Sequence, residues 1–387
     1  MKILYDHQAF TFQKFGGVSR CFCELIAQMP EGLETEISVR QSDNVHLLES
    51  HLCDGRLEPV TMNARIWNKK FPYKGFKRLY ITLRRAGLLS TMESANEHYS
   101  CRKLKEGNFD IFHPTFFDPY FLPLIGNKPW VFTVHDMMPE IITDYFKPNN
   151  GQTMFKRRYL PQAAHIIAVS ENTKKDLMKL MGVEDDRITV IYHGGPAREV
   201  ITAPRMVGEP YFLYVGTRVA YKNFQQTLID FADFHKEHPE VKLVCTGSDF
   251  VTSERQWMKD LGIADAVEHI SVSDEQMKNL YTNAIAFVYP SLYEGFGMPI
   301  LEAYAYGCPV LLNNKSCFPE IAADAAIYFD SVKGRSDLPA KLAEVYGLST
   351  NERQHVIEQG YDRLSLFSWK ASAEKLARVY EGVLGRS

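Results

Sequence analysis

The 387-residue sequence lacks the short motifs that mark several common kinds of catalytic site. It has no D-x-D pair of carboxylates for holding a metal and a diphosphate, no Walker A phosphate loop and no nucleophile elbow of a Ser-His-Asp hydrolase. His235 and His238 share one face of a predicted helix, but no convincing third ligand accompanies them. We therefore expect neither a metal nor a resident cofactor.

Cysteine motifs and long apolar runs are also missing. The seven cysteines form no C-x-x-C, and several stand inside apolar runs, which predicts reduced, buried thiols in a cytosolic protein. Asp6 and His7 interrupt the N-terminal apolar run too early for a signal peptide. No apolar run reaches the roughly 18 residues that a membrane span needs. We expect a cytoplasmic protein in which any membrane contact is peripheral.

The sequence also carries little excess charge. Its net charge of −3 argues against a broad nucleic-acid surface, and we expect no nucleic-acid partner. Hydrophobic residues make up 45% and charged residues 24%, a balance typical of soluble globular proteins. A single hydrophobic core seldom grows to 387 residues, so two domains are expected.

The sequence does contain an alternation of short β-branched or aromatic runs with longer helical patterns. Strands are expected at residues 2–6, 35–39, 109–113, 130–136, 165–170, 188–194, 211–216, 242–247, 286–290 and 309–313. This alternation predicts parallel sheets in an α/β fold. Residues 196–210 contain three prolines and no clear periodicity, so we interpret them as a linker. We predict Rossmann-like domains over residues 1–200 and 201–365, followed by a C-terminal helix over 366–387 that packs back on the first domain.

One stretch, YPSLYEGFGMPILEAYAYGCPV at residues 289–310, combines a glycine turn with two carboxylates. Its predicted helix, MPILEAYAY, has Pro299 in the first turn and Gly307 after its end. The preceding loop and the positive end of the helix dipole would together hold a phosphate. Glu294 and Glu302 would repel a bare phosphate, so we interpret them as acceptors for hydroxyls on a sugar or ribose that carries the phosphate.

This stretch resembles the E-x7-E signature of GT-B-fold retaining glycosyltransferases, specifically glycosyltransferase family four. Further segments resemble that family's landmarks in their usual order: FGGVSR (15–20), VFTVHDMMPE (131–140), AVSENTKKDL (168–177), VIYHG (190–194) and YVGTRVAYKN (214–223). The resemblance spans nearly the whole chain and implies two Rossmann-like domains that face each other across a cleft. It implies that Glu302 holds the ribose of a donor nucleotide and that Glu294 holds hydroxyls of the donor sugar. The backbone that would cradle the sugar and diphosphate comprises Gly295, Phe296, Gly297 and Met298.

Two cations, Arg218 and Lys222, follow the predicted strand 211–216 at the edge where α/β folds bind ligands. Fixed positive charge there would stabilise a departing diphosphate without a metal. The family usually has adjacent Arg and Lys before an Asn, whereas here Tyr221 occupies the first position and the arginine stands three residues earlier. The alternative interpretation of both cations is solvated surface charge.

The resemblance adds residues of the first domain to the candidate site. His135 ends the predicted strand 130–136, and its family counterpart lies beside the donor sugar near the reacting carbon. The alternative role for His135 is that of a hydrogen-bonded packing residue. Gly16 and Gly17 would face the diphosphate and the acceptor across the cleft, the alternative being a simple tight turn. Ser170 is interpreted as a helix N-cap.

These features predict a metal-independent, retaining glycosyltransferase that moves a hexose-type sugar from a nucleotide diphosphate donor to a glycan or lipid-linked glycan. Its predicted catalytic residues are His135, Glu294, Arg218 and Lys222. Spacing does not identify the donor; family base rates favour GDP-mannose or a related GDP-sugar, with UDP-hexoses next. Two alternatives stay open, namely a nucleotide-sugar epimerase of the same architecture and a non-catalytic subunit that binds sugar nucleotides.

Residues 65–85, RIWNKKFPYKGFKRLYITLRR, contain eight lysines or arginines and no acidic residue. Aromatic residues alternate with the cations, a composition typical of segments that contact anionic lipid headgroups. We therefore predict peripheral attachment to the inner face of the cytoplasmic membrane and a lipid-linked glycan acceptor. A solvated helix face with its aromatic residues in the core is the main alternative, and RNA binding is a weaker one.

Overall fold

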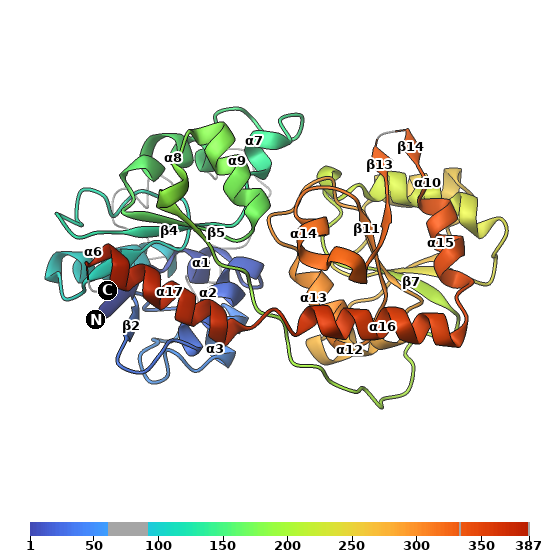
Figure 1. The fold of residues 1–387 in the computed structure, drawn as a ribbon, viewed down its shortest axis with the longest axis horizontal. Helices are drawn as coiled ribbons and strands as arrows, with labels where there is room; N and C mark the ends of the chain where they lie inside the picture. The colour runs from blue at the N-terminus through green and yellow to red at the C-terminus, as the bar shows by residue number, and fades with distance from the viewer. Residues whose placement is uncertain (61–91, 333, 386–387) are drawn as a thin grey trace.

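The computed structural model describes residues 1–60, 92–332 and 334–385, which form two α/β lobes (Figure 1). The basic segment 65–85 lies outside the described residues, so its predicted membrane contact is not addressed by the structure. Within the described part of the chain, no helix combines the length and the hydropathy needed to cross a bilayer.

The first lobe contains two three-stranded parallel sheets, ordered β2-β1-β3 and β4-β5-β6, and a parallel bridge between Phe112 and Trp130 joins them. Its strands are β1 (Lys2–Tyr5), β2 (Glu34–Ile37), β3 (Ile111–His113), β4 (Val131–Val134), β5 (His165–Ala168) and β6 (Ile188–Val190). Its helices are α1 (Gln8–Phe12), α2 (Gly17–Ala27), α3 (Val45–Glu49), α6 (Met92–Glu106), α7 (Met138–Ile141), α8 (Gly151–Tyr159) and α9 (Glu171–Met181).

The second lobe contains a six-stranded parallel sheet, ordered β12-β11-β10-β7-β8-β9. Its strands are β7 (Tyr211–Tyr214), β8 (Lys242–Cys245), β9 (Val267–His269), β10 (Phe287–Tyr289), β11 (Val310–Asn313) and β12 (Ile327–Phe329), with a short hairpin of β13 (Ser331–Val332) and β14 (Arg335–Ser336). Its helices are α10 (Phe224–His235), α11 (Thr252–Asp260), α12 (Asp274–Asn283), α13 (Met298–Ala305), α14 (Phe318–Ala322), α15 (Leu338–Tyr346) and α16 (Thr350–Leu364).

The central strands are buried along their whole length, as expected for parallel sheets covered on both faces. Every residue of β4, β7 and β11 is buried, which explains why these strands appear in the sequence as continuous apolar runs. All ten predicted strands are confirmed, each shorter than or offset from its predicted range. The edge strands β9 and β12 were not predicted, because each keeps only one fully buried residue and so lacks that apolar run.

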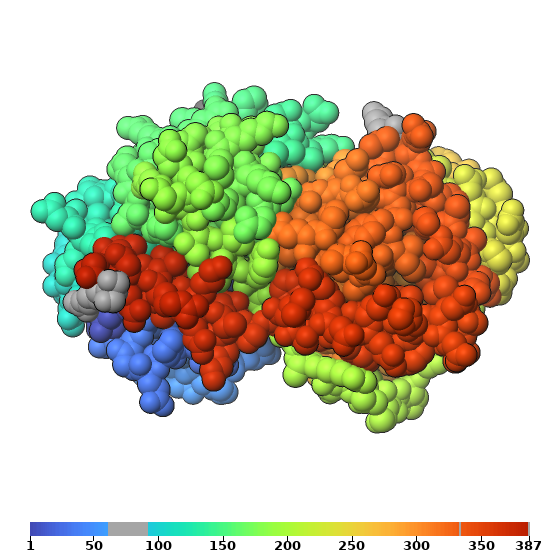
Figure 2. All heavy atoms as spheres, in the orientation of Figure 1, coloured from blue at the N-terminus to red at the C-terminus, as the bar shows by residue number. Residues whose placement is uncertain are grey.

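The chain crosses between the lobes twice. Residues 191–210 connect β6 to β7 with neither helix nor strand, in agreement with the predicted linker. After α16, helix α17 (Trp369–Val383) returns to the first lobe and ends near the N-terminus (Figure 1). The hydroxyl of Tyr380 on α17 lies 2.8 Å from that of Tyr5 and 2.6 Å from Nδ1 of His113, inside the first core. In the space-filling view, the red C-terminal helices run across the boundary where the lobes meet (Figure 2).

Candidate active site

The candidate site forms where the loop between β10 and α13 meets the first lobe. The strand ends at Tyr289, and the helix begins at Met298 with Pro299 in its first turn. Gly297 precedes the helix with a φ of 97°, in the left-handed region that favours glycine. Among the described residues, no side chain caps this helix end. Its first N–H groups therefore present the positive end of the helix dipole to the loop.

Gly295 brings this loop into direct contact with the first lobe. A Cβ atom at this position would collide with the carbonyl oxygen of His135, which follows β4. The carbonyl oxygen of Gly295 accepts a hydrogen bond from the Ser170 hydroxyl at 2.7 Å. Ser170 also caps α9, as predicted, because its side chain accepts the N–H of Thr173. Two segments that the sequence singled out, around His135 and around Gly295, thus meet backbone to backbone.

Glu294 pairs with Lys222 because neighbouring strands bring them together. Lys222 follows β7, which lies beside β10 in the sheet. Its Nζ atom is 2.5 Å from Oε1 of Glu294 and 3.5 Å from the Tyr289 hydroxyl, and the paired side chains are only 15% and 12% exposed. The Ser316 hydroxyl bonds both the N–H and the C=O of Glu294, which fixes the loop. An ammonium has three N–H donors, so Lys222 keeps capacity for an anion.

Glu302 pairs with Arg20, a residue that the sequence interpretation did not single out. Arg20 lies on α2 of the first lobe and Glu302 on α13 of the second, so this ion pair crosses the lobe boundary. The Tyr281 hydroxyl approaches the second carboxylate oxygen of Glu302 at 3.4 Å. The only available signal for Arg20 was its position in FGGVSR, about one helical turn after the glycines.

Of the two glycines before Arg20, Gly17 faces α13, whereas Gly16 lies against the side chain of Gln13. Gly16 is the N-cap residue of α2, and Gly17 is the first residue of that helix. A Cβ atom at Gly17 would lie 2.8 Å from Cε of Met298, the first residue of α13. The glycine loop predicted to face the donor thus lies against the helix end predicted to bind the diphosphate.

His135 lies in a buried group with Cys21 and His193. Its Nε2 atom is buried and has no hydrogen-bond partner among the described residues. Nδ1 of His193 lies 3.3 Å from Sγ of Cys21, and one ligand atom from each of the three residues lies within 4.8 Å of the others. Burial lowers the pKa of His135 to about 4 and raises the pKa of the Cys21 thiol, so both groups are neutral near pH 7.

This group is the one set of three potential metal ligands found in the described part of the chain. A metal bound there would have to displace the thiol proton of Cys21 and compete with the hydrogen bond to His193. The landmark segments VFTVHDMMPE and VIYHG contain His135 and His193, and Cys21 directly follows FGGVSR, but nothing in their spacing indicated that the three residues meet. The expectation of a metal-independent protein stays a prediction.

Arg218 has a different environment from Lys222. Its Nε atom lies 3.1 Å from Oε1 of Glu254, and its side chain is 4% exposed and stacks on Phe250. Its remaining donors bond backbone carbonyl oxygens, those of Thr246, Ser248 and Asp249. These bonds occupy most of the five guanidinium N–H groups, so Arg218 holds the loop between β8 and α11. The predicted contact between Arg218 and a diphosphate is not supported by this geometry.

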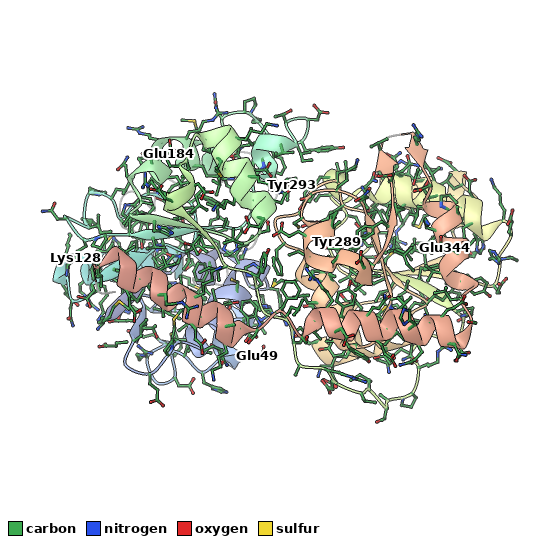
Figure 3. All side chains as sticks on the ribbon, viewed as in Figure 1. Glu49, Lys128, Glu184, Tyr289, Tyr293 and Glu344 are labelled. Atoms are coloured by element: carbon green, nitrogen blue, oxygen red, sulfur yellow. The ribbon has the colours of Figure 1, made fainter. Side chains whose placement is uncertain are left out.

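Two further contacts tie this site to the first lobe. Tyr293, which precedes Glu294, lies at the lobe boundary in Figure 3 and donates from its hydroxyl to Asp176 at 2.7 Å. Glu320 on α14 accepts the N–H groups of Glu171 and Asn172 at 2.6 and 2.9 Å. A carboxylate from the second lobe therefore complements the N-terminus of α9 in the first.

Two family profiles match most of the chain. The profile described as Glycosyltransferase Family 4 matches residues 15–195, and that described as Glycosyl transferases group 1 matches residues 202–363. The boundary between the matches falls in the segment that connects β6 to β7.

The chain is similar to two proteins named as O-antigen chain mannosyltransferases. RfbU of Salmonella typhimurium is 31% identical over 208 residues, which cover 54% of this chain and 58% of that protein. O-antigen chain mannosyltransferase B of Escherichia coli is 26% identical over 290 residues, which cover 70% of this chain and 74% of that protein. The aligned part thus spans little more than half the length of the Salmonella relative.

Solved structures share the fold over nearly the full length. Sucrose-phosphate synthase from Thermosynechococcus elongatus has a TM-score of 0.71 at 16% identity, and the match covers 100% of this chain and 99% of that one. Anabaena Alr3699/HepE, solved with UDP-glucose, has a TM-score of 0.69 at 16% identity, and the match covers 99% of this chain and 100% of that one. At this identity the likeness concerns the fold alone, and it confirms the predicted GT-B arrangement of two Rossmann-like domains.

Proposed function

Because the chain belongs to the group 1, family 4 glycosyltransferases, we propose that it transfers a hexose from a nucleotide diphosphate donor to an acceptor hydroxyl with retention of anomeric configuration. The observation that carries this proposal is the Lys222–Glu294 pair beside the N-terminus of α13, with Glu302 one turn inside that helix. A cation and a helix N-terminus suit a diphosphate, while the two carboxylates suit hydroxyls.

In the proposed complex, the diphosphate lies against the N-terminus of α13 and Lys222. Glu302 accepts the ribose hydroxyls, and Glu294 accepts hydroxyls of the transferred sugar. His135 stays neutral because burial lowers its pKa to about 4, so its imidazole can hydrogen-bond a sugar hydroxyl. Binding at Glu294 and Glu302 requires the ligand to share or replace their bonds with Lys222 and Arg20.

The proposed chemical step is a front-face substitution. The bond between the anomeric carbon and the phosphate oxygen breaks, and the acceptor oxygen bonds to the same face of that carbon. The acceptor proton passes to the departing phosphate oxygen. Lys222 and the helix N-terminus stabilise the charge that develops on the diphosphate, so the proposal needs no metal.

GDP-mannose is the first donor to test, because the two relatives described above are named as mannosyltransferases. UDP-hexoses come next. A donor panel in a thermal-unfolding assay ranks these candidates, since a ligand at 100 times its Kd stabilises a protein by about 2.7 kcal/mol.

The decisive experiment incubates the protein with the best-binding donor, with and without a panel of glycan acceptors. A glycosyltransferase releases the nucleotide diphosphate in proportion to acceptor and forms a product whose anomeric configuration, read by NMR, matches the donor. An epimerase converts the donor without acceptor, and a non-catalytic subunit binds it without turnover. Either of these results, or an inverted product, would contradict the proposal.

The two carboxylates provide a matched pair of variants. Glu302→Gln should weaken the affinity for free nucleotide diphosphate, because that carboxylate is proposed to hold the ribose. Glu294→Gln should lower sugar transfer while leaving that affinity nearly unchanged. Equal nucleotide binding by the wild type and Glu302→Gln would contradict the ribose assignment.

We further propose, from the sequence alone, that residues 65–85 hold the protein on anionic membranes near a lipid-linked acceptor. Each cation close to such a surface contributes about 1 kcal/mol, so half of the eight would suffice for reversible binding at low salt. Flotation on anionic vesicles should decrease with salt, and further when four of the segment's lysines become serine. Protein that stays in solution at low salt would contradict this attachment.

A further inference from the structure

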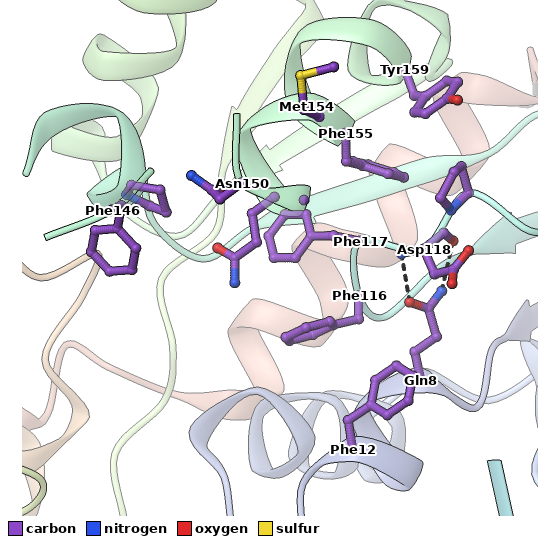
Figure 4. A pocket seen from close by; sticks show the side chains of 14 residues that line it. Gln8, Phe12, Phe116, Phe117, Asp118, Phe146, Asn150, Met154, Phe155 and Tyr159 are labelled. Carbon is purple, nitrogen blue, oxygen red and sulfur yellow. Dashed lines mark hydrogen bonds between the residues drawn. The ribbon is translucent and has the colours of Figure 1, made fainter. Parts of the chain in front are cut away.

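A cavity of about 580 Å³ lies on the first lobe beside the candidate active site, within the range of volumes usual for small-molecule sites. It is lined by α1, by the loop after β3 and by the segment from α7 to α8 (Figure 4). Six of the fourteen residues that line it are aromatic, namely Phe12, Phe116, Phe117, Phe146, Phe155 and Tyr159.

Some of these rings form the floor of the cavity and others stand free. Phe117 packs on the core through Phe132, with ring centroids 5.5 Å apart. Phe116 stands between Phe117 and Phe12, with centroids 5.1 and 6.1 Å away. The side chain of Phe12 is 46% exposed, and that of Met154 on the opposite wall is 45% exposed. Large apolar side chains left uncovered around a cavity mark a binding surface more often than a packing defect.

Two polar side chains of the cavity, those of Gln8 and Asn150, are committed to the protein itself. The amide of Gln8 donates to the carbonyl oxygen of Asp118 at 3.1 Å and accepts its N–H at 2.8 Å (Figure 4). Asn150 caps α8 by accepting the N–H of Thr153. The exposed Asp118 carboxylate accepts one N–H, from Tyr120 at 3.0 Å. It keeps acceptor capacity for hydroxyl donors of a ligand.

The charge of the described lining residues also restricts the kind of ligand. No lysine, arginine or histidine among the described residues lines it. The cation behind its wall, Lys156, is completely buried and donates to Glu140 at 2.8 Å and to the carbonyl oxygen of Asp136 at 2.9 Å. A phosphate would therefore meet the Asp118 carboxylate without a compensating charge, whereas a neutral ligand with hydroxyls would not.

The cavity reaches the candidate active site at Phe146. The ring of Phe146 lies 6.4 Å from that of Tyr221 in the second lobe, and the next residue, Lys222, pairs with Glu294. On the other side, Pro139 of α7 lines the cavity, three residues after Asp136. A ligand in the cavity would thus lie beside the sugar that Glu294 is proposed to hold.

We propose that this cavity binds the acceptor through a neutral sugar ring that packs its C–H face on Phe116 and directs hydroxyls to Asp118. This inference rests on the proposed function and adds the chemistry and the place of the acceptor. The phosphate of a lipid-linked acceptor lies outside the part of the cavity that the described residues line, because none of them is a cation.

The test is saturation-transfer NMR on the full chain with the nucleotide diphosphate bound. The probes are the methyl pyranosides of mannose, glucose, galactose and N-acetylglucosamine, with farnesyl diphosphate as the competing lipid-phosphate ligand. We expect signal transfer to the ring C–H protons of at least one glycoside. Phe116→Ala should weaken its binding about ten-fold, as the loss of one stacking ring predicts. Asp118→Asn should weaken it less, and farnesyl diphosphate should not displace it.

Two controls separate specific from general effects. Tyr99→Ala removes an aromatic ring from the outer face of α6, where Tyr99 stacks on Arg102, and should leave glycoside binding unchanged. Phe12→Ala, at an exposed ring, should reproduce part of the Phe116→Ala loss without lowering Tm. Absence of binding by every glycoside, equal binding by Phe116→Ala, or displacement by farnesyl diphosphate would overturn the inference.

Nucleotide affinity, measured on the same samples, distinguishes a failure of the acceptor inference from a failure of the proposed function. If the variants and the wild type bind the nucleotide equally but no glycoside binds, the acceptor inference fails and the proposed function stands. If no nucleotide sugar binds the wild type, the proposed function itself fails.

Discussion

The Nζ atom of Lys222 lies 2.5 Å from Oε1 of Glu294, although 72 residues separate them in the chain. They meet because β7 and β10 are neighbours in a parallel sheet, so the segments that follow them leave from the same edge. The pair places a cation and a carboxylate side by side at the N-terminus of α13. In the proposed complex the diphosphate would meet the cation, and the hydroxyls of the sugar would meet the carboxylate.

Lys222→Met should lower kcat by about 10²- to 10³-fold, the usual cost of removing one donor that acts on charge developing in the transition state. The affinity for the intact donor should change much less, because the charge of the diphosphate grows only as the sugar departs. Steady-state kinetics with the preferred donor, together with nucleotide titrations, separate the two effects.

The matched control for Lys222→Met is Lys278→Met. Lys278 also belongs to the second lobe and forms ion pairs, with Glu199 and Glu275, but on the surface. Its loss should leave kcat within about two-fold, as expected for a surface pair. Equal kcat values for Lys222→Met and Lys278→Met would contradict the proposed role of Lys222 in stabilising the departing diphosphate.

Gly295→Ala should abolish most activity without unfolding either lobe. The added Cβ atom would collide with the carbonyl oxygen of His135, so the loop between β10 and α13 must shift away from the first lobe. Gly208→Ala is the control, since a Cβ atom there meets nothing within 4 Å. A Gly295→Ala variant with wild-type kcat would show that this close approach is not required for turnover.

Ten strands, the linker and the turn that carries the two acids could be predicted from the sequence because each has a local signature. Buried parallel strands are continuous apolar runs, and Gly297 with Pro299 marks the start of α13. The partners of the acids were harder to find. Arg20 meets Glu302 only because α2 and α13 face each other across the lobe boundary. The spacing of residues along the sequence does not indicate that these two helices pack together.

Arg218 shows that a position in the chain need not indicate what a side chain contacts. Its position after β7 suggested a diphosphate contact, yet three residues of the neighbouring β8–α11 connection, together with Glu254 of α11, take up its donors. The sequence showed a departure from the family spacing but could not show what the displaced arginine touches instead. Every residue has a backbone carbonyl oxygen, so the residue types in a sequence do not indicate which of these oxygens accept a hydrogen bond.

Arg218→Ala should therefore act mainly on stability. It leaves Glu254, 7% exposed, without its partner, and removing one member of a buried ion pair costs about 3–5 kcal/mol. We expect a lower urea midpoint and a smaller fall in kcat than for Lys222→Met. Arg218→Met combined with Glu254→Leu should recover part of the stability. A stable Arg218→Ala variant with a large loss of kcat would restore the catalytic role.

Chelation should leave activity unchanged, because Lys222 and the N-terminus of α13 supply the positive charge for the diphosphate. Assays with EDTA, followed by addition of excess Mg²⁺ or Zn²⁺, check this. A loss that metal restores would contradict metal independence and direct attention to Cys21, His135 and His193. In that case Cys21→Ser should remove the metal response.

Buried histidines make the folded state sensitive to acid. Burial lowers the pKa of His7 and His135 to about 4 and that of His113 to about 3, against a value near 6.5 in an unfolded chain. Between pH 6.5 and 4 the unfolded chain therefore binds more protons, and stability falls as the pH drops. His193, whose pKa burial also lowers, adds to this effect. Asp6 acts in the opposite direction, because burial raises its pKa to about 6, and burial likewise raises the pKa of Asp136, Asp176 and Asp230.

His135→Gln should reduce this acid sensitivity by a measurable amount. Between pH 7.5 and pH 5 the wild type should lose about 2 kcal/mol more stability than the variant, since one histidine titrates from a pKa near 6.5 when unfolded and about 4 when folded. Urea unfolding at four pH values in this window measures the difference in slope, which does not depend on how the substitution changes stability at pH 7.5. His355→Gln, at an exposed position on α16, should keep the wild-type slope. Identical slopes for the wild type and His135→Gln would show that the His135 ring titrates alike in the folded and unfolded chains, and the neutral role proposed for it beside the donor sugar would lose its basis.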